Sequence, residues 1–552
     1  MLEDLLQRKP YNAAADFVDA PVARGFGKKI AFIDPDRSLT YAELQERTCR
    51  FAAALQSLGL RPEERLALLI YDNVDFPVAF WGGIRAGNVV LPLNTLLTAE
   101  QYAYILVDSR AAALVVAAPL AKTILSVLDR LPRLRTVILI DAGATETAAF
   151  SGRDVHDFSD VIARGSAAVF VAPTLSDEVA FWMYTSGSTG DPKGVKHVHT
   201  TLMAAARLMG QGVIGIREDD VVYSAAKLFF SYGLGNAMAF PLSVGANSVL
   251  LPQRVTPEAA FEVMRRHQPT IFYGVPTLYA LMLAHKEMKR GAGSDRLRLA
   301  VSAGEALPAD LGKRWQSAAG VDVLDGIGST EMFQTFLSNR PGDVRYGTTG
   351  KTVPGYDLKI VDEQGREAAA DEIGELVVRG PTAGEGYWNQ RAKSRHTFAG
   401  EWTYTGDKFS RDADGYYHCC GRTDDMFKVS GMWVSPFEVE AALATHEAVL
   451  EAAVIGKEDA DGLIKPKAFI VLRDGYVMDE HLRETLRVRE GMRRTVEVSA
   501  LDRYPARPAA HRHGEDSEVQ AKGIRGLMPS PRRARSTAMS IEEYGDGAKQ
   551  PT

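Results

Sequence analysis

Cysteine is scarce in this sequence. Only Cys49, Cys419 and Cys420 occur among 552 residues, and two of them are adjacent. Three cysteines placed in this way cannot form a disulfide framework, and they do not supply a usual zinc site. We expect them to be small packing residues in a reducing compartment, which indicates a cytoplasmic protein.

Long apolar runs and an excess of positive charge are also missing. No apolar run reaches the length of a membrane span, and the acidic start, Met1 to Asp4, lacks the basic-then-apolar pattern of a secretion signal. The formal net charge is −6 and the pI is about 6.1, which gives no electrostatic reason to expect nucleic acid binding. We therefore expect neither a membrane nor a nucleic acid as a partner.

The first half of the chain alternates short apolar strands with helices. Thr40 and Glu43 have the spacing of a capping box, and apolar residues at helical spacing continue to Gly59. Because the chain is too long for one hydrophobic core, we expect two or more domains. The alternation predicts α/β layers with largely parallel strands, with a helix at residues 74–85 and strands at residues 66–70, 89–93, 113–116 and 137–140.

The pattern changes after about Gly355. Residues 356–361 and 375–379 look like strands of a smaller sheet, and a hairpin near Gly415 leads to a domain boundary. A second compact unit follows, with a predicted helix at residues 436–444 and predicted strands at residues 452–455 and 468–472. We predict a large layered α/β N-terminal domain of residues 1–423 and a small, mobile α+β domain of residues 424–487.

A segment rich in serine and glycine carries the strongest chemical signal. Residues 184–194 read Tyr-Thr-Ser-Gly-Ser-Thr-Gly-Asp-Pro-Lys-Gly and follow the apolar strand at residues 179–183. Glycines let the backbone turn tightly and present N–H groups to phosphate oxygens, while the hydroxyls and Lys193 add donors and positive charge. It is not a Walker A loop, because Gly194 follows the lysine. The predicted phosphate-binding residues are Thr185, Ser186, Gly187, Ser188, Thr189, Gly190 and Lys193.

Four further motifs follow in order, at residues 302–305, 325–331, 402–407 and 421–428. Together with the serine- and glycine-rich segment they resemble the adenylate-forming superfamily, which includes acyl-CoA synthetases, peptide-synthetase adenylation domains and luciferases. The resemblance covers about residues 10–486, although Ile327 stands where many members have Tyr. It implies further nucleotide-binding residues: Ser302, Ala303, Gly304, Glu305, Asp325, Gly326, Ile327, Gly328, Ser329, Thr330, Asp407 and Arg422.

The resemblance also implies a role for individual residues. Thr185, Lys193 and Glu331 would be catalytic, with Glu331 helping to hold Mg²⁺, since a hard oxygen ligand suits that ion. Asp407 would accept the ribose hydroxyls of ATP, and Arg422 would lie near ribose or phosphate. The small domain would rotate about Asp424 between two half-reactions. The CoA side would be lined by Ser430, Gly431 and Trp433.

The substrate class comes from a closer resemblance. Residues 224–236 and 337–350 are similar to benzoate-CoA ligases and their hydroxybenzoate relatives. An aromatic acid needs a flat apolar slot with few polar groups, and polar residues at positions 231 and 334 would suit a hydroxyl or amino substituent on the ring. A homodimer is a family-level expectation. The candidate lining is Phe230, Ser231, Tyr232, Tyr273, Gly304, Ile327, Phe333 and Gln334.

The tail departs from the family. The superfamily ends its small domain with a Thr-Gly-Lys motif whose lysine contacts the carboxylate and the α-phosphate, and this sequence has none after Lys467. Plausible codons for residues 513–523, read from the second base, encode Thr-Gly-Lys-Ile-Gln-Arg, and residues 496–503 give Lys-Tyr-Pro-Arg-Trp-Ile in the same way. We hypothesise a one-base frameshift near residues 487–490, so that residues 488–552 form an aberrant tail. By composition, residues 493–535 should be disordered.

The sequence thus predicts an ATP-dependent ligase that forms benzoyl-CoA, or a hydroxy- or aminobenzoyl-CoA, through an acyl-AMP intermediate with ATP, Mg²⁺ and CoA. The missing lysine would weaken adenylation, because it stabilises charge on the phosphate oxygens. Two alternatives remain open. One is a catalytically impaired remnant that binds nucleotide or aryl acid, and the other is an aryl-adenylating enzyme that loads a carrier protein.

Overall fold

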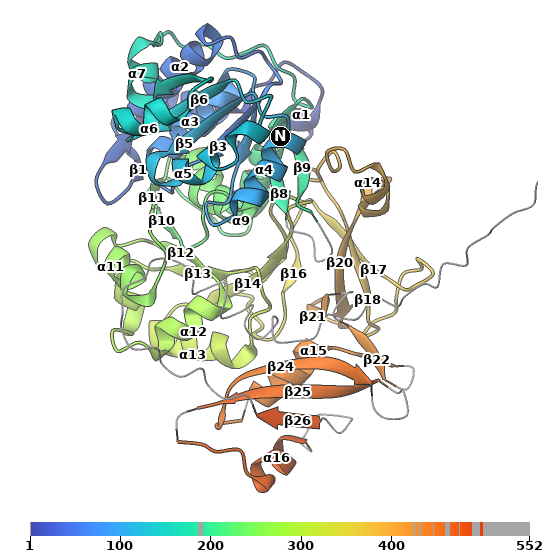
Figure 1. Ribbon diagram of the computed structural model, residues 1–552. Helices are drawn as coiled ribbons and strands as arrows, with labels where there is room; N and C mark the ends of the chain where they lie inside the picture. Colours follow the sequence, from blue (N-terminus) through green and yellow to red (C-terminus); the bar gives the residue numbers. More distant parts are fainter. Residues whose placement is uncertain are drawn as a thin grey trace, which may run out of the picture. The chain divides into compact units, whose positions relative to one another are not determined.

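The computed structural model describes residues 2–185, 191–422, 426–429, 432–444, 446–458, 464–473, 475–487 and 497–500 (Figure 1). The chain divides into two compact units, residues 1–438 and residues 439–552. The boundary that we predicted at residues 423 and 424 stays a prediction.

The capping box predicted at Thr40 is confirmed at the start of α2 (Tyr41–Ser57). The Thr40 side chain accepts from the Glu43 N–H, and the Glu43 carboxylate accepts from the Thr40 N–H at 2.8 Å. The helix ends before Gly59, whose φ of 77° lies in the left-handed region that favours glycine. Its apolar face includes Leu44, which is fully buried.

The first sheet has seven strands in the order β7-β6-β5-β3-β4-β8-β9. All neighbouring pairs are parallel except β8 and β9, which are antiparallel. The predicted strands of the first half are confirmed as β3 to β6, and the helix predicted at residues 74–85 is α3 (Asp75–Arg85). The strands are β3 (Arg65–Leu69), β4 (Val89–Pro92), β5 (Ala113–Ala117), β6 (Thr136–Ile140), β7 (Asp154–Asp157), β8 (Val179–Thr185) and β9 (Lys193–Val198).

The second sheet has nine strands in the order β16-β15-β14-β13-β12-β10-β11-β1-β2. Its central strands, from β14 to β1, are parallel, so their carboxyl ends meet at one edge. The motifs at residues 302–305 and 325–331 lie on the adjacent strands β13 and β14 of this sheet. The strands are β1 (Ile30–Ile33), β2 (Ser38–Thr40), β10 (Val221–Ser224), β11 (Asn247–Val249), β12 (Ile271–Gly274), β13 (Leu299–Ser302), β14 (Val323–Gly328), β15 (Thr335–Ser338) and β16 (Lys351–Thr352).

A third sheet of the first unit has five strands. The strands predicted at residues 356–361 and 375–379 are confirmed as β17 and β18, and the predicted hairpin is formed by β20 and β21. The two hairpin strands pair Asp407 with Arg422. The strands are β17 (Asp357–Val361), β18 (Gly374–Arg379), β19 (Phe398–Ala399), β20 (Trp402–Arg411) and β21 (Tyr417–Arg422).

The second unit contains the antiparallel pair β24 (Val449–Glu458) and β25 (Ile464–Leu472) and the helix α16 (Glu480–Arg487). The helix predicted at residues 436–444 is confirmed as α15 (Pro436–Ala444). The prediction that residues 493–535 lack regular structure is wrong for β26 (Glu497–Ala500), which pairs in parallel with β25. A strand needs backbone hydrogen bonds more than a long periodic pattern, and the edge of β25 supplies them.

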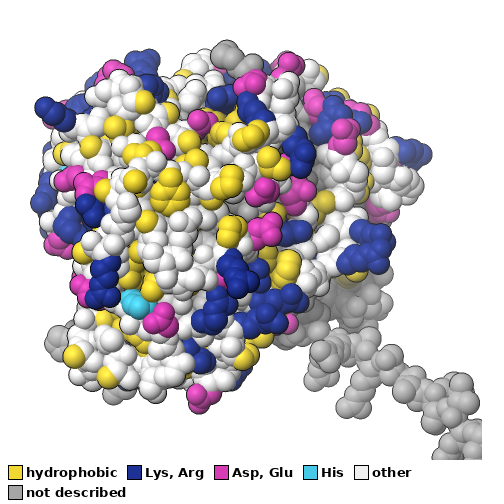
Figure 2. All heavy atoms as spheres, turned by 90° about the horizontal axis from the view of Figure 1, so that it is seen from above, with side chains coloured by type: hydrophobic (Ala, Val, Ile, Leu, Met, Phe, Trp, Pro, Cys, Tyr) yellow, Lys and Arg dark blue, Asp and Glu magenta, His cyan; other side chains and the backbone are white. Residues whose placement is uncertain are grey.

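The surface carries charge of both signs. On the face shown in Figure 2, Lys and Arg side chains are interspersed with Asp, Glu and apolar side chains. In the described part of the chain, none of the helices has both the length and the apolar composition needed to cross a bilayer.

Candidate active site

The serine- and glycine-rich segment connects β8 to β9. Thr185, the last residue of β8, lies directly opposite Lys193, the first residue of β9, in the antiparallel register. The hairpin therefore brings the two ends of the segment together. Ser186, Gly187, Ser188, Thr189 and Gly190 lie outside the described residues, so their predicted phosphate contacts stay predictions.

The start of this hairpin is anchored to α4 (Ala99–Asp108). The Tyr184 hydroxyl donates to Asp108 Oδ2 at 2.7 Å, and the Trp388 indole N–H donates to the Asp108 carbonyl oxygen at 2.9 Å. Burial raises the pKa of the Asp108 carboxyl. The indole of Trp388 also packs on Trp182 of β8, with 4.7 Å between ring centroids. The strand that leads into the segment is thus held on both sides.

Ser302, the last residue of β13, lies directly opposite Asp325 of β14 in the parallel register. Both are buried, and among the described residues neither Ser302 Oγ nor Asp325 Oδ1 has a hydrogen-bond partner. Burial raises the pKa of Asp325 well above its ordinary value. A bound ligand or a water molecule can satisfy buried polar atoms of this kind. The structure therefore brings the two predicted nucleotide motifs together.

Gly304 follows β13 and Gly328 ends β14, and both positions require glycine. Gly304 has a φ of 92°, where a side chain would strain the backbone. A Cβ at Gly328 would lie 2.6 Å from the Gln334 carbonyl oxygen, so only glycine fits there. Ala303 is buried, whereas Glu305 is exposed and accepts from Thr277 Oγ1 at 3.3 Å. Ile327 is half-buried and packs against the main core.

A short turn between β14 and β15 holds the predicted catalytic glutamate. Ser329 Oγ accepts from the Met332 N–H at 3.2 Å, and the Phe333 N–H donates to the Thr330 carbonyl at 3.1 Å. Phe333 has a φ of 61°, which is uncommon for a residue with a side chain. Such strain persists only where neighbouring contacts hold it.

Sequence reasoning missed His197, which supports this turn from β9. The ring is fully buried and stacks on Phe181 with 5.0 Å between centroids. Burial lowers the pKa of His197 to about 4, so the ring is neutral at pH 7. Its Nε2 lies 2.8 Å from the Thr330 carbonyl oxygen and must carry the proton that it donates. The sequence holds no periodic signal that distinguishes His197 from other histidines.

Sequence reasoning also missed Tyr387, which contacts two predicted catalytic residues. Its hydroxyl donates to Glu331 Oε1 at 2.6 Å. Lys193 Nζ lies 4.6 Å from the centroid of its ring. Because Tyr387 lies outside the motifs, only the folded chain shows its contact with Glu331 and Lys193.

Asp407 lies on β20 and is almost fully buried, with 7% of its surface exposed. Burial raises its pKa to about 6, against the opposing effect of Arg422. Arg422 forms an ion pair with Asp407 at 3.2 Å between Nη1 and Oδ1, and its side chain is 57% exposed. The two residues predicted to meet ribose and phosphate therefore contact each other across the β20–β21 hairpin.

Some residues of the predicted aryl slot do come together. The rings of Tyr232 and Tyr273 meet edge to face with 6.2 Å between centroids. The Tyr232 hydroxyl lies 3.3 Å from the Val301 carbonyl oxygen and 3.4 Å from that of Gly274, at the ends of β13 and β12. Tyr273 has no exposed surface and belongs to the main core.

The Gln334 side chain is engaged by the protein. Its amide nitrogen donates to the Tyr232 carbonyl oxygen at 3.1 Å and to Asn236 Oδ1 at 3.3 Å, while its amide oxygen accepts from the Thr335 N–H at 2.9 Å. The amide therefore fastens residues 231–236 to β15. To hydrogen-bond a hydroxyl or amino substituent of the substrate ring, as predicted, the amide would have to give up some of these contacts.

The two remaining aromatic candidates lie in different surroundings. Phe333 is fully buried against Phe181 and His197. Phe230 is 49% exposed and packs on Phe229, while Ser231 is half-buried. The structure thus joins Phe333 to the supports of the Glu331 turn rather than to an open surface.

The hinge and CoA predictions fall mostly outside the described residues. Asp424, Ser430 and Gly431 are not described. The backbone of Trp433 lies in β23 (Met432–Val434), opposite Lys428 of β22 (Phe427–Val429). Their roles stay predictions.

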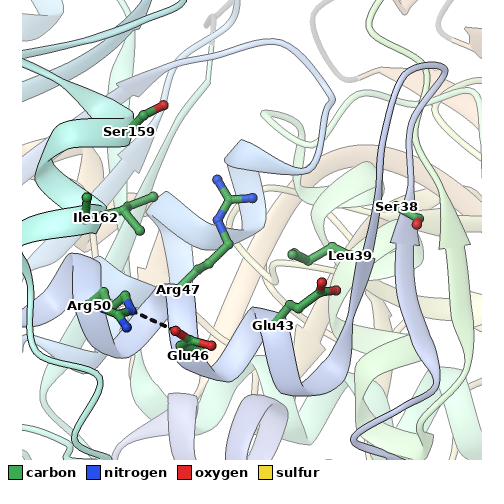
Figure 3. Close-up of a pocket in the computed structure, with 9 residues that line it drawn as sticks. Ser38, Leu39, Glu43, Glu46, Arg47, Arg50, Ser159 and Ile162 are labelled. Atoms are coloured by element: carbon green, nitrogen blue, oxygen red, sulfur yellow. Dashed lines mark hydrogen bonds and ion pairs between the residues drawn. The ribbon is translucent and has the colours of Figure 1, made fainter.

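A surface pocket between α2 and α7 (Phe158–Arg164) is shown in Figure 3 and measures about 350 Å³. Its charged residues already have partners: Arg47 binds Asp75 at 2.9 Å, Arg50 binds Glu46 at 2.9 Å, and Glu43 belongs to the Thr40 capping box. None of the predicted site residues lines it. A second pocket of about 730 Å³ adjoins the end of the serine- and glycine-rich segment at Asp191 and Pro192.

Comparison with known protein families agrees with this arrangement. The profile of the AMP-binding enzyme family matches residues 20–388, and the profile of the AMP-binding enzyme C-terminal domain matches residues 438–506. The second match continues beyond residue 487 and includes β26.

Individual relatives are similar over most of their length. The chain is 53% identical over 464 residues to the 4-hydroxybenzoate-CoA/benzoate-CoA ligase of Rhodopseudomonas palustris, covering 84% of each chain. It resembles the crystal structure of a benzoate-CoA ligase from Burkholderia xenovorans, with a TM-score of 0.81, 42% identity and coverage of 90% and 97% of the two chains. It also resembles an anthranilate-CoA ligase solved with anthranoyl-AMP, with a TM-score of 0.83, 40% identity and coverage of 90% and 95%.

Proposed function

The chain belongs to the AMP-binding enzyme family and, within it, to the benzoate-CoA ligases. From that membership we propose that it converts benzoate, or a ring-substituted benzoate, into its CoA thioester. The observation that carries this proposal is the 53% identity to an aryl-CoA ligase over most of both chains. The convergence of the motifs around the β8–β9 hairpin and the edge of the nine-stranded sheet supports it.

The reaction has two steps. A carboxylate oxygen attacks the α-phosphorus of ATP, the bond to the β-phosphate oxygen breaks, and pyrophosphate leaves. The CoA thiol then loses its proton to solvent, its sulfur attacks the acyl carbon, and AMP leaves with the electron pair of the acyl–phosphate anhydride bond. Both steps depend on positioning and on charge stabilisation more than on covalent help from the protein.

The side chains of the site suit these needs. Lys193 supplies positive charge at the end of the serine- and glycine-rich segment that is predicted to bind phosphate. Asp407, held in a nearly buried position, can accept two ribose hydroxyls once it is ionised. Ser302 and Asp325 offer polar atoms that the described protein leaves unpaired. The nucleotide would therefore lie along the edge where β13 and β14 end.

The residues present fit a Mg²⁺ ion bound with ATP. The described residues contain no group of three or more His, Cys, Asp or Glu that could hold a metal alone. Mg²⁺ commonly uses one or two carboxylates together with substrate phosphates and water, and Glu331 is a half-buried carboxylate that accepts from the Tyr387 hydroxyl. Glu331 would hold the ion, which neutralises phosphate charge when it is bound.

The test of the proposed function is thioester formation from a supplied aryl-adenylate. Purified protein is incubated with CoA and benzoyl-, 4-hydroxybenzoyl- or 2-aminobenzoyl-adenylate, and the thioester is measured by chromatography. We expect thioester formation with at least one of the three, faster than with an aliphatic acyl-adenylate. Equal rates for the aliphatic compound, or no thioester above the rate without protein, would contradict the proposal.

A further inference from the structure

Residues 384–388 form a short backbone clasp between the β8–β9 hairpin and the turn that contains Glu331. The Gly384 N–H donates to the Glu331 carbonyl oxygen at 2.8 Å, and the Glu385 N–H donates to the Lys196 carbonyl oxygen at 2.8 Å. The Trp388 N–H then donates to the Gly194 carbonyl oxygen at 2.8 Å. One five-residue segment is therefore bonded to both sides of the nucleotide site.

Tyr387 is the residue of this clasp whose side chain turns toward the site. Its hydroxyl bonds Glu331 Oε1, and its ring lies against the Lys193 ammonium, so one side chain contacts groups of opposite charge. Burial, and then the neighbouring Glu331 carboxylate, raises the pKa of the phenol far above its ordinary value. The hydroxyl therefore stays protonated and donates to the carboxylate.

The ring itself is held firmly. Its edge meets Phe398 with 5.4 Å between centroids, and its backbone N–H donates to Ser394 Oγ at 2.9 Å. The side chain is 5% exposed. Because its ring is held in place, the Tyr387 hydroxyl can fix the orientation of the Glu331 carboxylate, which a mobile side chain could not do.

We propose that Tyr387 is a positioning residue for the nucleotide: its hydroxyl sets the Glu331 carboxylate for Mg²⁺, and its ring sets the Lys193 ammonium for the phosphates. This inference rests on the proposed function and adds to it. One phenol therefore contacts both charged groups, the carboxylate through its hydroxyl and the ammonium through its ring. The ring of a phenylalanine would retain the second role and lose the first.

The test measures ATP affinity by calorimetry with and without Mg²⁺, and it requires no turnover. In Tyr387→Phe we expect the enhancement of affinity by Mg²⁺ to fall on the order of tenfold, as for a lost hydrogen bond to a charged group. Affinity for ATP without Mg²⁺ should stay the same. In Tyr387→Leu that affinity should also fall about threefold, because the cation–π contact is lost.

Tyr346→Phe is the matched control, since the Tyr346 hydroxyl also donates to a carboxylate, Asp322 Oδ1, at 2.9 Å. This variant should keep the full Mg²⁺ enhancement. A double-variant cycle guards against a general loss of structure: with Glu331→Gln already present, Tyr387→Phe should have no further effect on the enhancement.

Three outcomes would overturn the inference. These are a full Mg²⁺ enhancement in Tyr387→Phe, an equal loss in Tyr346→Phe, and additive effects in the double variant. If the unaltered protein binds ATP no better with Mg²⁺ than without it, the proposed role of Mg²⁺ and this inference fall together. Thioester formation from aryl-adenylate does not depend on this result, so the failure of the inference is distinguishable from the failure of the proposed function.

Discussion

Asp407 combines a nearly buried carboxylate with a solvent-exposed cationic partner. Only its ionised form can accept from two ribose hydroxyls, and burial opposes ionisation. The exposed Arg422 guanidinium partly offsets that effect. The residue is therefore poised close to the pH at which it changes charge.

The affinity for adenosine should fall as the pH falls through about 6. With a pKa of about 6, Asp407 is almost wholly ionised at pH 7.5 and mostly protonated at pH 5, so we expect a loss of about tenfold between these values. Adenosine is the probe because, unlike ATP, it has no group that titrates in this range. Calorimetric titration at both pH values measures the change. Asp407→Asn should bind weakly at both, and a flat profile for the unaltered protein would contradict the prediction.

His197 should make the free energy of unfolding depend on pH in the acidic range. Its pKa is about 4 in the folded protein and about 6.5 when unfolded, so the unfolded state binds more protons between these values. Stability from this residue is therefore present above pH 6.5 and lost as the pH falls toward 4.

We expect the free energy of unfolding to lose about 2 kcal/mol from this source between pH 7 and pH 4.5. His197→Gln should lack this loss, whereas the similarly shifted His199 remains in both proteins and cancels in the difference. Urea unfolding at the two pH values gives the comparison. If the two proteins differ by the same amount at both values, the prediction fails.

At the scale of elements, the segment after β10 depends on a close approach between Gly235 and β15. A Cβ at Gly235, in η5 (Gly235–Ala239), would lie 2.1 Å from Gln334 Nε2. The amide could retreat only by giving up its bonds to the Tyr232 carbonyl and Asn236. The clash would therefore disturb residues that we predict to line the aryl slot.

Gly235→Ala should lower the free energy of unfolding by about 2 kcal/mol, as expected for overpacking of a filled core. Gly27→Ala is the control, because a Cβ there would meet Ala42 and Val22 at ordinary distances of 3.6 and 3.7 Å. It should change stability by less than about 1 kcal/mol. Denaturant unfolding of both variants decides the matter, and equal effects would show that the Gln334 contact does not constrain the backbone.

Elements with strong local signals were predictable from the sequence. The capping box at Thr40, the buried strands β3 to β6 and the helix α15 agree with the prediction because periodicity, caps and apolar runs are local properties. The strand β26 was missed because its pairing with β25 comes from tertiary contact.

The site residues that could be predicted from the sequence are those that belong to recognisable motifs. Lys193, Glu331 and Asp407 stand in recognisable strings, whereas His197 and Tyr387 act through contacts across 133 and 56 positions in the chain. Distances of that kind are set by sheet order, which no single segment encodes. For the same reason, the engagement of the Gln334 amide by residues 231–236 could not be foreseen.

At the scale of the whole molecule, the altered tail should slow the first half-reaction, adenylation, much more than the second, thioester formation. Because the chain lacks the family's Thr-Gly-Lys ending, we expect pyrophosphate release from ATP and benzoate to be slower on the order of 10²–10³-fold than in a protein with that ending. Thioester formation from supplied adenylate should be affected much less.

The comparison protein comes from the same gene with the proposed frameshift near residues 487–490 reversed. Pyrophosphate release and thioester formation are measured for both proteins under the same conditions. Equal pyrophosphate release would show that another residue replaces the missing lysine. A gene whose resequencing confirms the printed tail would remove the frameshift hypothesis itself.

The clasp at residues 384–388 also bears on how the large unit melts. It lies between β18 of the five-stranded sheet and α14 (Arg391–Thr397), and it is bonded to the seven-stranded sheet through Lys196 and to the Glu331 turn of the nine-stranded sheet. Three sheets joined by one short segment should lose their structure cooperatively. Calorimetry should therefore show a single transition for this unit, and Gly384→Pro, which removes the N–H bonded to Glu331, should split that transition in two.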